Sequence, residues 1–381
     1  MRRAVVLALL AAASAVLFAP SASAAGAGSW PWLGLNGNSV SYLGPVDTFS
    51  SHGIAYDRNF ELTAGQLPSE LEPGAEGQEF ERRFAEDRVD GMIPVVVIEF
   101  RGYTGEYQST PQFPQTRTRS EEAAGMTTPK GYAEGFVRSA AAILRLANAG
   151  GHSTPVLFEP INEPWGYTTP QYDGAQYAKV IAELMPAAAR AGIPAESIYV
   201  GAVGSGWVSQ MYEAQPSLRS SIQGWYMHPY GPPRGPGATE VGIRAVSTVR
   251  SAIASGQNNI VVSEVGFCAT DVNNSHPHEP GGNSCVGQQV GTSKVAANDL
   301  RAMLERAAEY HAAGWLKALM VYSRNAGGWA MQKYPQLTLS RAGRALVRFA
   351  DEQAPAGAAL VQAIKVSPDI EAEEDEAFAP E

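Results

Sequence analysis

Two glutamates follow apolar runs that are typical of buried strands. Glu163 lies in the run Asn162-Glu163-Pro164, directly after residues 155–161, and Glu264 lies within the run 259–267. Two carboxyl groups in different surroundings can divide acid–base work, one keeping its proton for donation and the other acting as the ionised partner. Hydrolysis of a glycosidic bond needs this pair, because the departing oxygen is protonated while a carboxylate attacks or activates water.

Other side chains near strand ends suit the support of such a pair. His228 and Tyr230 stand two residues apart, so both leave an extended strand on one face. Arg58 and Tyr230 are donors that would hold Glu264 ionised, and Trp165 is an apolar neighbour that would keep Glu163 protonated. We therefore expect these residues to meet in one site.

The pattern of the chain predicts an α/β fold in which short strands alternate with amphipathic helices. The predicted strands are residues 32–36, 53–58, 92–100, 155–161, 197–203, 224–230, 259–267 and 317–322. The predicted helices are residues 78–89, 132–149, 172–191, 239–255, 293–313 and 340–352. Eight such units favour a single (β/α)8 TIM barrel, in which catalytic groups lie at the carboxyl ends of the strands. An open doubly wound sheet is the alternative, but Gly34-Leu35-Asn36-Gly37 does not match its glycine-rich phosphate turn.

The same residues resemble a known group of enzymes. The resemblance rests on Phe158-Glu159-Pro160-Ile161, Asn162-Glu163-Pro164, His228-x-Tyr230 and Glu264 followed by Gly266-Phe267. Together they resemble the clan A barrel glycosidases, which include the cellulase-like glycoside hydrolase family 5. The resemblance implies Glu163 as acid/base, Glu264 as nucleophile and Asn162 as a donor to the sugar 2-hydroxyl. It also implies retention of configuration, with carboxyl groups about 5–5.5 Å apart.

Two positions depart from family 5. Strand three of that family ends in a histidine where this chain has Glu99, and strand eight ends in a tryptophan where this chain has Tyr322, with Trp329 further on. Clan A, including family 39-like relatives, accommodates both departures. Trp165, Trp207 and Trp329 are candidate platforms for sugar rings, because aromatic faces stack on them. Glu159 is predicted to be a buried structural carboxylate.

The ends and the charge of the chain suggest where the protein acts. Residues 1–24 resemble a secretory signal peptide, with Arg2-Arg3, an apolar run and Ala22-Ser23-Ala24. Residues 25–353 are predicted to form the catalytic domain and residues 354–381 an acidic disordered tail. The net charge is −10 and the basic residues are scattered, which argues against a nucleic-acid partner. We expect a secreted, extracellular monomer that acts on a carbohydrate, without a membrane anchor.

The two cysteines and the loop between them complete the sequence prediction. Cys268 and Cys285 are predicted to form a disulfide, as a pair of cysteines in an exported protein commonly does. His276 and His278 lie between them, but their spacing fits no zinc or calcium pattern. No metal or cofactor is therefore predicted. Two rival functions stay open: a carbohydrate-binding barrel without catalysis, and a metal-assisted hydrolase.

Overall fold

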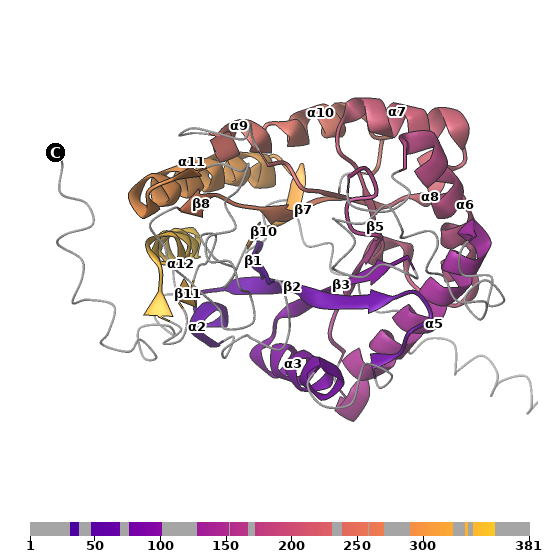
Figure 1. Cartoon of the computed structure of the whole chain (residues 1–381), viewed down its shortest axis with the longest axis horizontal. Coiled ribbons are helices and arrows are strands. Elements are labelled where there is room, and N and C mark those ends of the chain that lie inside the picture. The colour runs from indigo at the N-terminus through magenta and orange to yellow at the C-terminus, as the bar shows by residue number, and fades with distance from the viewer. Residues whose placement is uncertain are drawn as a thin grey trace, which may run out of the picture.

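The core of the protein is a parallel eight-stranded sheet that curls into a barrel (Figure 1). The structure is a computed structural model that describes residues 31–37, 47–68, 76–100, 128–151, 153–166, 172–230, 238–257, 259–269, 290–322, 332–333 and 338–354. The barrel strands are β1 (Leu33–Asn36), β2 (Ile54–Thr63), β3 (Ile93–Glu99), β4 (Leu157–Pro160), β5 (Tyr199–Gly201), β6 (Gly224–Met227), β7 (Asn259–Val265) and β10 (Leu316–Tyr322).

The strand order is β4-β3-β2-β1-β10-β7-β6-β5. A parallel bridge between Phe158 and Ile198 joins the region of β4 to that of β5. The first and last strands of the ring also pair, with Asn36 beside Tyr322. The predicted (β/α)8 barrel is therefore confirmed.

Helices surround the strands, as Figure 1 shows. They are α2 (Asp47–Ser50), α3 (Glu76–Asp90), α5 (Pro129–Ala147), α6 (Gly174–Arg190), α7 (Ser205–Ala214), α8 (Leu218–Ser221), α9 (Ala238–Ile243), α10 (Ala245–Ala252), α11 (Ser293–Ala312) and α12 (Arg341–Gln353). Short 3-10 turns cover η5 (Ala149–Gly151) and η6 (Ala195–Ser197), and two small sheets pair β8 (Cys268–Ala269) with β9 (Val290–Gly291) and β11 (Gln332–Lys333) with β12 (Thr338–Leu339).

Side-chain caps fix where several long helices begin. Thr128, Thr292 and Ser340 each accept a backbone N–H of the first turn of α5, α11 and α12. Asp173 forms a capping box with Gln176 at the start of α6. Such caps satisfy donors that a helix leaves without an internal partner, so they set the helix boundaries.

The buried residues divide between the inside of the barrel and the layer beneath the helices. Tyr56, Val95, Tyr199, Tyr226 and Met320 belong to one buried cluster, to which seven of the strands contribute residues. The larger cluster unites the opposite strand faces with the apolar stripes of the helices. Alternation along the strands thus separates two packed layers, as expected in this fold.

Several elements differ from the sequence prediction, and the largest differences are in β2 and in the helices. Strand β2 continues to Thr63 instead of ending at Arg58. Its pairing with β3 shifts register between Asp57 and Phe60 and then resumes beyond the polar residues 57–59. The predicted helix 239–255 is broken into α9 and α10, and Gly242, a poor helix former, lies just before the break. Helices α2, α7 and α8 were not predicted.

No helix within the described ranges has the length and apolar character needed to cross a membrane. The predicted signal peptide, residues 1–24, lies outside the described residues, as do residues 355–381 of the predicted tail.

Candidate active site

Glu163 follows β4 in a turn of unusual backbone conformation. Ile161 has a φ of 64° and Glu163 a φ of 43°, both in the left-handed region that side chains with a Cβ rarely adopt. Each such residue costs on the order of 1–3 kcal/mol, so tertiary contacts must hold the turn. Strained positions of this kind concentrate at functional sites.

The Glu163 carboxyl group is almost fully enclosed, with 6% of the residue exposed. Its Oε1 atom lies 2.7 Å from Nδ1 of His228. Burial raises the pKa of Glu163 to about 7, although the positive charge of Arg58 acts in the opposite direction. Glu163 can therefore hold a proton near neutral pH, as a general acid must.

Glu264 lies on β7 in a different environment, where three donors reach its carboxylate. Tyr230 donates to Oε1 at 2.7 Å, while Arg58 Nη1 and Asn36 Nδ2 each lie 3.2 Å from Oε2. Burial raises the pKa of Tyr230 well above its usual value, so this phenol stays a donor. The donors stabilise negative charge on Glu264, which suits a nucleophile.

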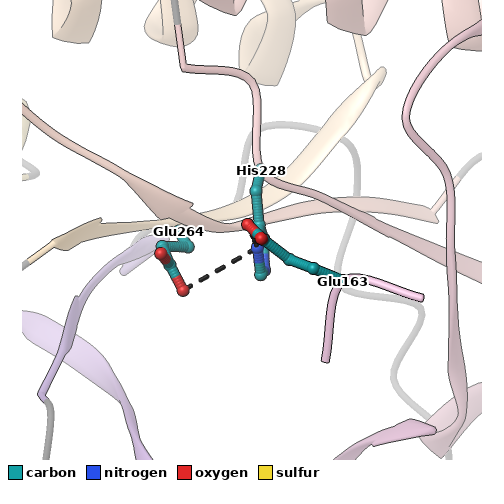
Figure 2. Close-up of side chains that lie close together, drawn as sticks. All are labelled: Glu163, His228 and Glu264. Atoms are coloured by element: carbon teal, nitrogen blue, oxygen red, sulfur yellow. Dashed lines mark hydrogen bonds and ion pairs between the residues drawn. The ribbon is translucent and has the colours of Figure 1, made fainter. Parts of the chain in front are cut away.

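His228 lies between the two glutamates (Figure 2). Its Nδ1 atom is 3.7 Å from Oε2 of Glu264, and its Nε2 atom is 3.1 Å from Oγ of Ser263. The imidazole is buried, and burial lowers its pKa to about 4, so the ring is neutral at physiological pH. A neutral ring can accept a hydrogen bond from protonated Glu163, or donate one to Glu163 once that carboxyl group is ionised. The Ser263 hydroxyl can donate to the other ring nitrogen or accept from it, so it fits both states of the ring.

The separation of the two carboxyl groups limits the chemistry between them. One oxygen of Glu163, one oxygen of Glu264 and a ring nitrogen of His228 all lie within 4.8 Å of one another. This spacing is shorter than the roughly 6.5–9.5 Å that leaves room for a water between two carboxyl groups in inverting glycosidases.

Arg58 connects the site to β4 and to the turn that carries Glu163. Its Nε atom donates to Oε2 of Glu159 at 2.7 Å, and Nη2 donates to Oδ1 of Asn162 at 2.8 Å. Burial alone would lower the pKa of Arg58, but Glu159 and Glu264 raise it above its usual value. Glu159 is fully buried, as expected of a structural carboxylate.

The predicted aromatic residues have different positions. Trp165 is half-buried and contacts His228 edge-on, with ring centroids 6.0 Å apart. The suggestion that Trp207 is a sugar platform is wrong, because the indole is buried and donates to the carbonyl of Gly201. Tyr322 pairs with Asn36 across β10 and β1. Trp329 lies outside the described residues, and so does Cys285, so the disulfide with Cys268 stays a prediction.

Three residues of the site were not predicted from the sequence. Asn36 reaches Glu264, Ser263 reaches His228, and Glu99 accepts the backbone N–H of Asn162 at 2.8 Å. Asn36 and Glu99 each end an apolar barrel strand, which is the signal that would have identified them. Ser263 gives no such signal, since a small hydroxyl within a buried strand is common.

The donor set also bears on whether the site binds a metal. Glu163, His228 and Glu264 supply ligand atoms close enough for one cation. However, both oxygens of Glu264 accept protein donors, and both ring nitrogens of His228 make hydrogen bonds. Arg58 adds a fixed positive charge at the same place. This arrangement fits a hydrogen-bonded network better than a metal ligand set.

Comparisons with known proteins give the fold an independent test. Among solved structures, the chain resembles XacCel5A, with a TM-score of 0.53 and 11% identity over 85% of this chain and 99% of the other. It resembles an endo-β-1,4-mannanase of Cellulomonas fimi, with a TM-score of 0.53 and 12% identity over 87% and 74%. It also resembles the GH53 catalytic domain of Ignisphaera aggregans, with a TM-score of 0.54 and 12% identity over 83% and 95%.

No protein-family model matches the sequence, and no curated protein does. The similar solved structures nevertheless share one architecture, the barrel of glycoside hydrolase families 5, 26 and 53. The resemblance to clan A glycoside hydrolases is therefore confirmed at the level of the fold. At this identity the likeness carries no residue roles, which depend on the geometry described above.

Proposed function

We propose that the protein is a retaining glycoside hydrolase that cleaves β-glycosidic bonds by double displacement. The observation that carries the proposal is the pair formed by Glu163 and Glu264, with oxygens within 4.8 Å of each other at the carboxyl ends of β4 and β7. The two groups have opposite surroundings, since burial raises the pKa of Glu163 to about 7 while three donors surround Glu264. Such a division assigns the acid and the nucleophile.

In the first step, a Glu264 oxygen attacks the anomeric carbon, and the bond from that carbon to the departing oxygen breaks. Protonated Glu163 gives its proton to the departing oxygen, so the aglycone leaves as an alcohol. The product is a glycosyl ester on Glu264. Asn162 is held by Arg58 through its Oδ1 atom, which leaves its amide N–H groups for a sugar hydroxyl.

In the second step, water hydrolyses the ester. Glu163, now ionised, takes a proton from the water as its oxygen attacks the anomeric carbon, and the Glu264 carboxylate is released. The neutral ring of His228 can donate to Glu163 in this state. Two inversions give net retention, and both glutamates return to their starting forms.

The substrate is proposed to be a poly- or oligosaccharide met outside the cell, after export directed by residues 1–24. One solved structure of the same fold, ZgEngAGH5_4, is a complex with cellotriose, and another is an endo-β-1,4-mannanase of Cellulomonas fimi. β-1,4-Glucans and mannans are therefore the first substrates to assay.

The test combines a glycan panel with analysis of the first-formed anomer by NMR. We expect hydrolysis with retention, and covalent labelling of Glu264 by an activated 2-fluoro glycoside. Glu264→Ala should lower turnover about 10⁴-fold or more. Glu134→Ala, on the exposed face of α5, removes a carboxyl group far from this chemistry and is the matched control that should keep wild-type turnover. An inverted first product would refute the mechanism.

The rival functions give different results in the same assays. A carbohydrate-binding barrel would bind a glycan without turnover, and Glu264→Ala would leave that binding in place. A metal-assisted hydrolase would lose activity on dialysis against a chelator and regain it with a divalent cation. Activity that is insensitive to the chelator supports the two-glutamate mechanism.

A further inference from the structure

The backbone just before Glu163 is bound by a buried tyrosine of a distant strand. Tyr226 lies on β6, and its hydroxyl donates to the carbonyl oxygen of Ile161, the first left-handed residue of the turn. The ring is fully buried within the barrel. Because burial raises the pKa of Tyr226 well above its usual value, this hydroxyl remains a donor at any pH the fold tolerates.

The neighbouring backbone groups have partners of their own. Tyr177 donates to the Pro160 carbonyl at 2.7 Å, and the Asn162 N–H donates to Glu99 at 2.8 Å. The Ile161 N–H donates to the carbonyl of Ile98 at 3.1 Å. In this stretch of backbone, the Tyr226 hydroxyl thus binds the Ile161 carbonyl, whose orientation fixes the peptide plane that leads to Asn162.

Space for the hydroxyl is left by a glycine on the adjacent strand. A Cβ atom on Gly201 would lie 2.8 Å from the Tyr226 hydroxyl oxygen and 3.1 Å from Cζ3 of Trp165. Glycine at this position lets the ring of Tyr226 reach the turn. A methyl group there would displace the hydroxyl without removing it.

We propose that Tyr226 is a positioning residue for Glu163, holding the left-handed turn so that the carboxyl group meets His228 and faces Glu264. The proposal rests on the proposed function of Glu163 as acid/base. Within the described residues, the Tyr226 hydroxyl bonds to the Ile161 carbonyl and to neither carboxyl group. Its effect passes through the Ile161 carbonyl, two residues before Glu163.

Tyr226→Phe removes only the hydroxyl, and Tyr177→Phe is its matched control. Both tyrosines are fully buried and both donate to consecutive carbonyls, but Tyr177 binds Pro160, before the left-handed turn. Each variant is assayed on two glycosides of the same sugar. One has an alkyl leaving group that needs protonation, and the other has a dinitrophenyl leaving group that departs without it.

For Tyr226→Phe we expect kcat on the alkyl glycoside to fall about tenfold, equivalent to about 1.4 kcal/mol. On the dinitrophenyl glycoside the formation of the glycosyl-enzyme should change by less than about twofold. The alkaline limb of the pH profile should also move, because the Glu163 environment changes. Tyr177→Phe should keep the wild-type ratio between the substrates and the wild-type alkaline limb. Gly201→Ala should reproduce the effect of Tyr226→Phe.

Equal losses on both substrates in Tyr226→Phe and Tyr177→Phe, with unchanged pH limbs, would overturn the proposal and leave Tyr226 a purely structural residue. If the wild type hydrolyses none of the glycosides, the proposed function itself fails. NMR titration of the Glu163 carboxyl carbon then tests the positioning role of Tyr226 without an activity assay. A changed pKa in Tyr226→Phe but not in Tyr177→Phe supports positioning, and identical titrations refute it.

Discussion

Burial shifts the pKa values of Glu163 and His228 in opposite directions, because in each group it disfavours the charged form more than the nearby opposite charges favour it. Burial raises the pKa of the acid to about 7 and lowers the pKa of the base to about 4. Each group is therefore neutral in the folded protein across much of the range between these values. Glu163 therefore keeps a proton that it can give to the substrate, while Arg58 supplies a fixed positive charge beside Glu264.

The first prediction concerns stability at the residue scale. A carboxyl group whose folded pKa exceeds its unfolded value of 4.5 stabilises the fold fully below pH 4.5, and that contribution disappears as the pH rises through about 7. Glu163→Gln should therefore match wild type at pH 4 and be more stable at pH 8 by about 3 kcal/mol. Urea unfolding at both pH values measures the difference. A constant difference between the two pH values would contradict the burial argument.

The second prediction concerns activity, and its sign is set by the same proton. If Glu163 is the acid, kcat/KM should fall about tenfold per pH unit above pH 7, as the acid loses its proton. On a dinitrophenyl glycoside, which does not need the acid, the alkaline limb should be absent from formation of the glycosyl-enzyme in wild type and in Glu163→Ala alike. A limb that persists in Glu163→Ala would assign the titration to another group.

At the scale of elements, the site depends on how the strands pack beneath it. Because successive residues of β2 alternate between its faces, Arg58 faces the barrel interior, where it binds Glu159, and Asp57 faces α3, where Arg83 Nη2 lies 3.4 Å from Oδ2 of Asp57. Adjacent residues of one strand thus serve the site and the outer layer. Gly34 on β1 has an equally constrained position, because a neighbouring strand approaches its backbone closely.

The third prediction tests that close approach. A Cβ atom on Gly34 would lie 2.5 Å from Cβ and 2.7 Å from the carbonyl oxygen of Tyr56, so Gly34→Ala forces two strands apart. We expect a loss of about 3 kcal/mol or more in unfolding free energy. Gly206→Ala in α7 is the matched control, since nothing lies within 4 Å of its added Cβ and alanine favours helix. Similar losses in both variants would contradict the steric account.

At the scale of the whole molecule, α12 completes the ring of helices over the first and last strands. Leu346, Phe349 and Ala350 are buried, and the Phe349 ring meets Trp32 edge-on at 6.3 Å. The guanidinium of Arg301 on α11 lies over the same ring, 4.9 Å from its centroid. Each large side chain buried this way contributes about 1.5–3 kcal/mol, so α12 is an integral part of the barrel.

The fourth prediction separates α12 from the acidic stretch that follows it. Removal of residues 355–381 should leave the melting temperature unchanged within about 1 °C, because their composition predicts no buried contact. Removal of residues 341–381 should unfold the protein or lower its melting temperature by more than about 10 °C. Differential scanning calorimetry of the two truncations measures both effects. A large drop in the shorter truncation would show that the tail packs on the barrel.

The sequence by itself determined the alternation of strands and helices and the residues at their carboxyl ends, because periodicity and polarity are local properties. That was enough to predict the barrel and to bring Glu163, Glu264, His228 and Tyr230 to one face. It did not distinguish Trp207 in the core from a sugar platform, since both uses favour an indole near a strand end. The sequence also predicted that β2 ends at Arg58, because polar residues at an irregularity within a strand give the same pattern as polar residues at its end.

Only the tertiary structure decided what surrounds each carboxyl group. Asn36, Glu99, Ser263 and Tyr226 come from β1, β3, β7 and β6, and their contacts depend on strand register and tilt rather than on neighbouring sequence. The left-handed turn at Ile161 is likewise invisible in the sequence, because a β-branched residue disfavours it locally. The pKa of Glu163 depends on the sum of these long-range contacts and the exclusion of water, so it emerges only when the barrel closes.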